Sequence, residues 1–287
     1  MLNIIRADLY RIVRGKGVYI TMILLIAFLI LQVAARGSIE VFTVKIDGEE
    51  DEVYLREGRA ELRDFEGSEI GYGWKPAEDY NFAFTGNEAL IDTDILLYFL
   101  LPFIIFIAAA DFSTEAVKNT LSNGMPRTKY YLSKLILACI FCLFVLLLNI
   151  IIPIIAVSII SIIPASEIEI DIQFVNIIKP FFAQLFLCLA VTCVGIFFVF
   201  VTKRTAAVNG SYIAFCMVPL MITFILYQIN KDLQFLSDYE LISNIRMLAR
   251  IDAAESGDII RAFIIGGFYI LASTAGGILL FKRSEIK

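Results

Sequence analysis

Long stretches without a charged residue divide this sequence, and they constrain its fold more than any other feature. The runs are residues 17–35, 95–110, 135–166, 180–202, 205–230 and 262–281. A charged side chain costs ~2.5–3.5 kcal/mol at the centre of a membrane helix, and a helix needs roughly 17–25 apolar residues to cross a bilayer. The runs therefore predict an all-α polytopic membrane protein with six transmembrane helices.

The boundaries of the spans follow from these runs and their flanks. The shortest run recruits residues 92–94, and the longest contains Pro153, which predicts a kink or an interfacial end. The predicted spans are 17–35, 95–110, 135–163, 180–202, 205–230 and 259–281. The predicted flanking segments are an amphipathic connector helix over 1–16, an acidic segment over 36–94, loops over 111–134 and 164–179, a turn over 203–204, a helical segment over 231–258 and a tail over 282–287.

Basic residues are distributed unevenly between two sets of connections. One set holds 13 Lys and Arg but only 4 Asp and Glu, and it consists of residues 1–16, 111–134, 203–204 and 282–287. The rest of the chain holds 11 basic and 25 acidic residues. Loops rich in Lys and Arg remain in the cytoplasm. This predicts cytoplasmic termini in a cell (plasma) membrane and an extracellular location for the other three connections.

The five cysteines lie inside the predicted spans, which argues against a disulfide framework. They are Cys139, Cys142, Cys188, Cys193 and Cys216. The first two form a C-x-x-C pair, a spacing that occurs in redox and metal sites. The sequence has no histidine, and small side chains are favoured where membrane helices pack. We therefore expect the cysteines to be packing residues.

The first residues have the pattern of an amphipathic helix. Its apolar face consists of Leu2, Ile5, Leu9 and Ile12, and its basic residues are Arg6, Arg11, Arg14 and Lys16. Such a helix lies along a membrane surface, where it either anchors in lipid or faces a partner. The apolar run that follows is too long for the h-region of a signal peptide, so we expect a retained helix.

Two of the predicted extracellular segments have internal order. Residues 36–94 carry 16 acidic and 6 basic residues, and Asp47-Gly48 separates two β-rich stretches, which allows a β-hairpin in a small extracellular subdomain. A solvated acidic loop is the alternative. In residues 231–258, Ser237-x-x-Glu240 matches a capping box ahead of apolar positions that include Ile245. We expect a short helix there that ends before Ser256.

The chain lacks the residues that most enzymes need. Zero histidines remove the commonest general base and metal ligand. No phosphate-binding G-x-x-x-x-G-K-[ST] motif, G-x-S-x-G motif or intramembrane carboxylate pair is present. Uncharged spans also argue against proton-coupled transport. We expect no catalysis, no cofactor or metal on this chain and no nucleic-acid partner, so energy for any work must come from another subunit.

Residues 111–134 form an ordered polar connection between two apolar spans. Ser113 fits an N-cap with Glu115 in the first turn, and the helix is predicted to end at residue 121 or 122, before Asn123-Gly124. Four basic residues accompany it, namely Lys118, Arg127, Lys129 and Lys134. They either anchor at phospholipid headgroups or belong to a docking helix for a cytoplasmic motor.

The spacing Glu115, Thr120-Leu121, Arg127 and Lys134 resembles the E-x(4)-T-L-x(5)-R-x(6)-K signature of ABC-2 type transporter permeases. Residues 7–16 resemble the connector helix of that family. The resemblance implies an exporter permease in a bacterial plasma membrane, a second permease copy in a homo- or heterodimer, and a separate ATPase subunit that binds ATP and Mg.

Residue roles are also implied by the resemblance. Coupling to the ATPase falls to Ser113, Glu115, Lys118, Thr120, Leu121, Arg127 and Lys134. The connector helix supports coupling through Leu2, Ile5, Arg6, Leu9, Arg11 and Ile12. The extracellular gate includes Ser237, Glu240 and Ile245.

The cargo and the function class have alternatives. Small permeases of this type resemble exporters of amphipathic or antimicrobial peptides, and the acidic segment 36–94 favours cationic peptides by electrostatic steering. Drugs, lipids and polysaccharide precursors are other cargoes. A membrane sensor or scaffold that binds a ligand through the extracellular segment is an alternative of another class, and a membrane enzyme is disfavoured by the missing catalytic residues.

Overall fold

A computed structural model describes the backbone of residues 2–36, 39–46, 49–54, 69–75, 82–85, 88–160, 168–171 and 174–284. The chain forms two compact units. The first unit consists of Met1–Ile26, Thr85–Ile151 and Ile172–Lys287, and the second of Ala27–Phe84 and Ile152–Asp171. The candidate sites described below all lie in the first unit.

Six helices in the described part of the chain are long and apolar enough to cross a membrane. They are α2 (Lys16–Arg36), the run α4–η1–α5 (Thr93–Ile104, Ile105–Ala109 and Ala110–Ser113), α7 (Arg127–Ile160), α8 (Phe174–Thr202), α9 (Thr205–Ile229) and α11 (Ser256–Arg283). Helices satisfy all their backbone groups internally, which lipid requires. The prediction of a helical, multi-pass membrane protein is confirmed.

Several helices extend beyond the charge-free runs. The α4–α5 run includes Asp94 near one end and Asp111 near the other, and α7 begins at Arg127 and includes Lys134. The absence of charge is thus too strict a criterion for helix ends, because a charged side chain there can find a partner while the backbone stays helical. At Pro153 the structure has a continuous helix, so α7 does not end there.

A π-helical turn, η1, interrupts the second span. Pro102 precedes it and has no N–H to donate. A π turn adds a residue to the helix and turns the following side chains relative to the preceding ones. In this chain the residues after η1 include Asp111, which is buried.

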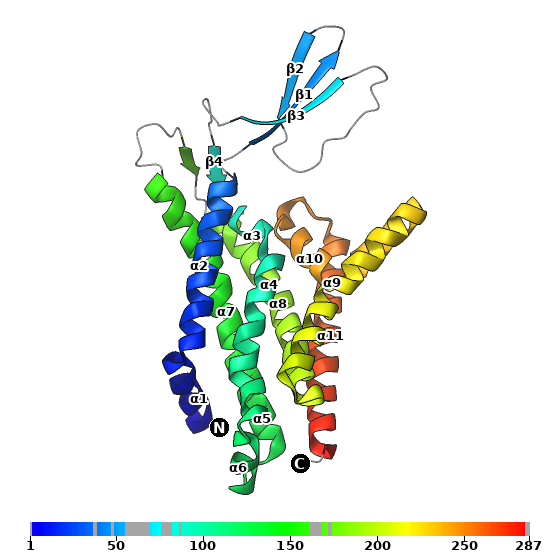
Figure 1. Cartoon of the computed structure of the whole chain (residues 1–287). Coiled ribbons are helices and arrows are strands. Elements are labelled where there is room, and N and C mark those ends of the chain that lie inside the picture. Colours follow the sequence, from blue (N-terminus) through cyan, green and yellow to red (C-terminus); the bar gives the residue numbers. More distant parts are fainter. Residues whose placement is uncertain are drawn as a thin grey trace. The chain divides into compact units, whose positions relative to one another are not determined.

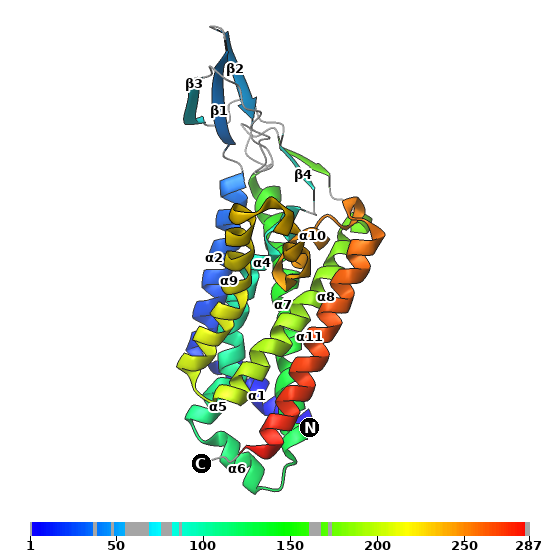
Figure 2. The ribbon, with the colours of Figure 1, turned by 90° about the vertical axis from the view of Figure 1, so that its right-hand side faces the viewer.

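The helix α8 is central in the first unit, and α11 lies beside it (Figures 1 and 2). The α8 side chains Leu187, Val191 and Ile196 are almost completely buried. Small residues allow close approach between helices. A Cβ atom at Gly277 of α11 would lie 2.7 Å from Cζ of Tyr131 on α7, so any larger residue there would force the Tyr131 ring to shift.

The N-terminal helix α1 (Leu2–Arg14) is amphipathic, but its buried face is not purely apolar. Asp8 and Ile12 are buried, whereas Leu9 is exposed. The prediction of one apolar face that includes both Leu9 and Ile12 is therefore only partly right, because the face toward the protein carries a buried carboxylate. Ile5 is half-buried and Arg6 is exposed, and the side chain of Leu2 is outside the described residues.

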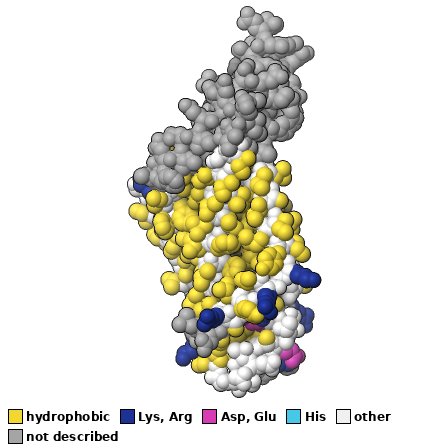
Figure 3. All heavy atoms as spheres, turned by 90° about the vertical axis from the view of Figure 1, so that its left-hand side faces the viewer, with side chains coloured by type: hydrophobic (Ala, Val, Ile, Leu, Met, Phe, Trp, Pro, Cys, Tyr) yellow, Lys and Arg dark blue, Asp and Glu magenta, His cyan; other side chains and the backbone are white. Residues whose placement is uncertain are grey.

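Apolar side chains cover much of the face drawn in Figure 3, and Lys and Arg side chains gather toward the end that carries α1. Exposed residues on α2 and α7 include Ile20, Leu24, Ile136 and Ile140. Exposed apolar surface of this extent is unfavourable in water and suits contact with lipid.

The second unit contains a three-stranded antiparallel sheet with β1 (Ile39–Ile46) between β2 (Glu49–Tyr54) and β3 (Glu69–Lys75). Phe42 of β1 pairs with Val53 on one side and with Tyr72 on the other. The strands lie where the sequence allows a hairpin, and the predicted turn residues 47 and 48 are outside the described residues. A separate ladder joins β4 (Phe82–Thr85) to β5 (Ile168–Asp171).

Short helices lie at the other end of the first unit from α1 (Figure 1). They are α3 (Glu88–Ile91), η2 (Lys231–Tyr239), α10 (Leu241–Leu248) and η3 (Ile251–Ala253). The predicted short helix after residue 237 is present, but the predicted Ser237 cap is wrong. Glu240 is the N-cap of α10 and accepts a 2.8 Å hydrogen bond from Ser243, while Ser237 belongs to η2. The 3-10 helix continues past Ser237 and moves the start of α10 toward the C-terminus.

Candidate functional site

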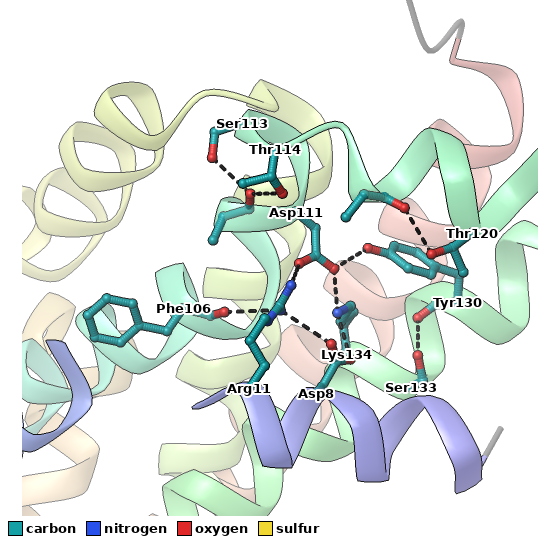
Figure 4. A network of polar contacts seen from close by, with 12 residues as sticks. Asp8, Arg11, Phe106, Asp111, Ser113, Thr114, Thr120, Tyr130, Ser133 and Lys134 are labelled. Atoms are coloured by element: carbon teal, nitrogen blue, oxygen red, sulfur yellow. Dashed lines mark hydrogen bonds and ion pairs between the residues drawn. The ribbon is translucent and has the colours of Figure 1, made fainter. Parts of the chain in front are cut away.

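Five polar side chains from three helices meet in one cluster (Figure 4). They are Asp8 and Arg11 of α1, Asp111 of α5, and Tyr130 and Lys134 of α7. Residues three or four apart share a helix face, so α1 and α7 each present two of these side chains together. We call these five residues the buried charge cluster.

Lys134 lies at the centre of the buried charge cluster. Its Nζ atom lies 2.6 Å from Oδ2 of Asp8 and 2.5 Å from Oδ2 of Asp111. The Lys134 side chain is only 1% exposed. Anchoring at lipid headgroups is therefore wrong for this residue, because its ammonium group is inside the protein.

Asp111 contacts side chains of both other helices of the cluster, α1 and α7. It forms an ion pair with Arg11 and accepts a 2.6 Å hydrogen bond from the Tyr130 hydroxyl, in addition to its contact with Lys134. Arg11 also lies 3.2 Å from Asp8. Burial raises the pKa of Asp8, while the charge of Lys134 acts against that rise. Two carboxylates and two cations leave the cluster formally neutral, which makes burial of these charges tolerable.

Aromatic rings pack beside the buried charge cluster. The ring centroids of Phe200 and Phe281 are 4.7 Å apart, and Tyr130 lies 6.1 Å from each. Phe112, which follows Asp111 in the chain, meets Phe200 edge to face at 5.5 Å. Such rings exclude water, and ionic interactions strengthen in the resulting low-dielectric surroundings.

The short helix α6 (Ala116–Ser122) follows the buried charge cluster directly. Its N-cap is Glu115, in the left-handed conformation with φ 58° and ψ 11°. That conformation costs a non-glycine residue roughly 1–2 kcal/mol. The Glu115 side chain is 69% exposed and lies 3.3 Å from the Lys118 ammonium group. An exposed carboxylate thus lies on a strained turn at the start of a half-buried helix.

The predicted N-cap role of Ser113 is wrong. Ser113 is the last residue of α5, and its hydroxyl donates to the Ala110 carbonyl at 2.8 Å. Thr114 bonds to the same carbonyl at 2.9 Å. Both hydroxyls bond backward along α5, so that α5 ends where the sequence predicted a new helix to begin.

The end of α6 agrees with its prediction. The helix stops at Ser122, and Gly124 has a φ of 84° and donates to the Leu121 carbonyl at 3.1 Å. Val117 is buried and fixes one side of α6. Leu121 and Thr120 are half-buried, and the Thr120 hydroxyl donates to the helix backbone at 2.9 Å.

Arg127 ties the start of α7 to the end of α11. Its Nη1 lies 3.1 Å from the Phe281 carbonyl, 2.9 Å from that of Lys282 and 2.7 Å from that of Ser284. A guanidinium group favours the unpaired carbonyls and the negative end of a helix. Headgroup anchoring is therefore wrong for Arg127 as well, since its guanidinium group binds within the protein.

The structure brings together only part of the residues predicted for coupling and for the connector helix. Arg11 and Lys134 belong to the buried charge cluster, and Glu115 and Lys118 form an exposed pair beside it. The sequence patterns assign no role to Asp111 or Tyr130, and Asp8 belongs only to the stretch 7–16 that resembles the connector helix. A signal for the two carboxylates existed. They are among the four acidic residues of the predicted cytoplasmic segments, and each lies close in the sequence to the end of a predicted span.

A second polar network lies at the α10 end of the first unit. Gln184 of α8 donates to the carbonyls of Leu90 at 2.9 Å and Ile245 at 2.8 Å, and the Thr93 hydroxyl lies 2.9 Å from its Oε1. Asn149 of α7 donates to Thr93 at 3.3 Å. Of the predicted gate residues, Ile245 thus takes part through its backbone. We call these five residues the Gln184 network.

An ion pair accompanies the Gln184 network. Arg246 of α10 donates to Oδ2 of Asp94 on α4 from Nη2 at 2.6 Å and from Nε at 2.9 Å. Its hydrogen bond with Asp94 raises the pKa of Arg246. The contacts from α4 and α8 hold α10 in a fixed position on the bundle.

The cysteines are free and sit among packed helices, as the sequence predicted. No group of metal-ligating side chains occurs among the described residues.

Comparisons with known proteins leave the function to be argued from geometry. No protein-family model matches this chain, and no curated protein matches it. The buried charge cluster with α6 and the Gln184 network with α10 are therefore the two features on which a functional proposal depends.

Proposed function

We propose that this chain is the permease subunit of an ATP-driven exporter of the ABC-2 type, and that α6 is where a separate ATPase subunit binds. The observation that carries the proposal is the attachment of α6. This half-buried helix begins directly after the buried charge cluster, which joins α1, α5 and α7, and Arg127 joins the following turn to α11. A displacement of α6 would be transmitted to four helices through ion pairs and hydrogen bonds.

An external energy source is consistent with the sequence. The chain has no phosphate-binding loop and no histidine, so ATP and Mg would bind to the partner subunit. Two permease copies, identical or different, would enclose the export path. The α6 end would face the cytoplasm of a bacterial cell, in agreement with the excess of basic residues in the connections at that end.

The α10 end would provide the outer gate. The Asp94–Arg246 pair connects α10 to α4, in the span whose other end precedes α6, and the Gln184 network connects α10 to α8. Closure driven from α6 would therefore reach α10 through rigid helices.

Co-purification with an ATPase tests the proposal. A tagged chain is purified from its native cells, and an ATP-hydrolysing subunit is expected with it. Recovery of an active membrane protein without an ATPase would contradict the proposal.

A charge reversal tests the role of α6 specifically. Glu115→Lys should detach or uncouple the ATPase without unfolding the permease, because the side chain is exposed. Glu255→Lys is the matched control, since Glu255 is also an exposed residue before a helix but lies at the α10 end. Normal recruitment and export in Glu115→Lys would exclude α6 as the ATPase contact.

We propose amphipathic, cationic peptides as the cargo. The support is the excess of acidic residues in 36–94, which would concentrate cations near the outer end of the path. Neutralising Glu49, Glu50, Asp51 and Glu52 should lower export of a cationic peptide, or resistance to it, and should affect a neutral peptide less. Unchanged export of both peptides would rule out this steering while leaving the ATPase proposal in place.

A further inference from the structure

An apolar cavity of about 340 Å³ lies between α9, α10 and α11. Its lining includes Phe215, Val218 and Ile222 of α9, Tyr239 and Glu240 before α10, and Tyr269 of α11. The volume falls at the small end of the ~300–1,000 Å³ range of ligand pockets. Figure 2 shows α10 between the upper ends of α9 and α11.

The one charged residue of this lining is incompletely paired. Glu240 is only 7% exposed. Its Oε2 accepts a hydrogen bond from Ser243, but its buried Oε1 has no hydrogen-bond partner among the described residues. A buried, unpartnered carboxylate oxygen is costly unless a donor reaches it.

Two cations of the neighbouring elements α10 and α11 have other partners. Arg246 pairs with Asp94, and Arg261 pairs with Asp258 at 3.0 Å while its guanidinium group lies 5.7 Å from the Tyr239 ring. Neutralisation of Glu240 by a side chain is therefore not found in the described part of the chain.

Aromatic faces add a second preference for positive charge. Phe215 and Tyr269 meet edge to face with ring centroids 5.6 Å apart, and both line the cavity. Aromatic rings attract ammonium groups, most strongly where water is excluded. The remaining wall is aliphatic, which suits a hydrocarbon chain.

From these features we infer that the cavity binds an amphipathic organic monocation, with its ammonium group at Glu240 and its apolar part against α9. The inference concerns binding and does not require the proposed export role. Two sources carry this chemistry, namely the ammonium headgroup of a membrane lipid and a free amphipathic amine, which includes an amine of a peptide.

Photo-crosslinking tests the inference on the full chain in uncharged dodecyl maltoside micelles. The probe is octylamine with a terminal diazirine, and crosslinked peptides are identified by mass spectrometry. Crosslinks are expected on the α9 residues of the cavity, with octylamine competing at least about tenfold better than octanol of the same chain length, because one charge-assisted contact is gained. Equal competition by both compounds would overturn the inference.

Two variants and a control separate the charge from the cavity. Glu240→Gln keeps the size of the side chain and should reduce octylamine binding about tenfold without changing octanol binding. Ile222→Trp fills the cavity from an exposed position and should reduce both. Glu255→Gln, at an exposed carboxylate, should change neither. Wild-type octylamine binding in Glu240→Gln would overturn the inference.

Added lipids distinguish the two sources. Phosphatidylethanolamine should compete with the probe if a lipid headgroup is the natural occupant, whereas phosphatidylglycerol, which lacks an ammonium group, should not. Competition by free amines alone assigns the cavity to a soluble amphipath. The binding experiment uses the purified chain without an ATPase subunit. Its result is therefore independent of the ATPase proposal, and either proposal can fail while the other holds.

Discussion

The Nζ atom of Lys134 lies 2.6 Å from Oδ2 of Asp8, although 126 residues separate them in the sequence. The contact joins the N-terminal helix to the start of α7, and Asp111 completes it from the end of the second span. An amphipathic helix at a membrane surface is usually held by lipid. In this protein it is also held by buried charge, so α1 belongs to the same mechanical unit as the helices beside α6.

Removing the central cation should destabilise the protein strongly. Lys134→Met leaves Asp8 and Asp111 buried with only Arg11 to compensate them, and an uncompensated buried charge costs about 3–5 kcal/mol. Thermal stability of the purified protein in detergent measures the effect. Lys129→Met is the control, because Lys129 is exposed and close by on the same helix.

A double variant checks that the loss arises from charge. In a Lys134→Met background, Asp8→Asn removes one uncompensated carboxylate, and part of the lost stability should return. If Asp8→Asn destabilises Lys134→Met further, packing rather than charge balance explains the effect of Lys134.

Two variants of Glu115, the left-handed residue at the start of α6, distinguish the effect of its backbone conformation from the effect of its charge. Glu115→Gly relieves a backbone conformation that glycine adopts freely, and should stabilise the turn by about 1 kcal/mol. Glu115→Gln keeps the strain and removes the charge, and should leave stability unchanged because the side chain is exposed. Unfolding measurements compare the two. If Glu115→Gly destabilises the protein, strain in the left-handed conformation does not determine the stability of the turn.

The sequence predicts the membrane helices well and their ends poorly, for a physical reason. Charge-free runs report where lipid surrounds a helix, whereas Asp94, Asp111 and Lys134 continue helices into regions where each finds a partner. Asp94 and Arg246 are 152 residues apart and Asp8 and Lys134 are 126 apart, so these pairs leave no local pattern. The ends of α6 illustrate the contrast, since the local signal at Gly124 correctly predicts the end of the helix, whereas the local signal at Ser113 is overridden by α5.

The buried charge cluster could be predicted only in part. Basic residues at the ends of spans have a common explanation in lipid headgroups, and that explanation fails for Lys134 and Arg127 because three-dimensional contacts override it. The partners in the Gln184 network could not be predicted either, because a lone glutamine in a span indicates a helix–helix hydrogen bond without identifying the partner.

Arg127 should stabilise the end of α11. Arg127→Met removes the contacts to two α11 carbonyls and to that of Ser284, which follows the helix, and a cation at a helix C-terminus is worth about 0.3–2 kcal/mol. Amide hydrogen exchange over residues 280–284 should accelerate, and Arg127→Lys should restore only part of the protection, since an ammonium group lacks the planar fork. Arg283→Met, at an exposed position, should change exchange little.

Gln184 should control the attachment of α10. Gln184→Leu leaves the carbonyls of Leu90 and Ile245 without their donor, at about 1–3 kcal/mol for each buried group. Hydrogen exchange across 241–248 should rise as α10 loosens. Gln228→Leu makes the same replacement at an exposed site on α9 and should not loosen α10. Equal protection in both variants would show that α10 is held by the Asp94–Arg246 pair instead.

Two glycines of α11 allow a matched test of helix packing. A Cβ at Gly277 would clash with the buried Tyr131 ring, whose hydroxyl donates to the Ser273 carbonyl at 3.3 Å, whereas a Cβ at Gly267 would meet nothing within 4 Å. Gly277→Ala should therefore cost about 1–3 kcal/mol through overpacking. Gly267→Ala should gain up to about 1 kcal/mol from helix propensity. Thermal unfolding of both variants decides the matter, because a similar gain in each would mean that the Tyr131 ring moves freely and that α11 does not depend on this contact.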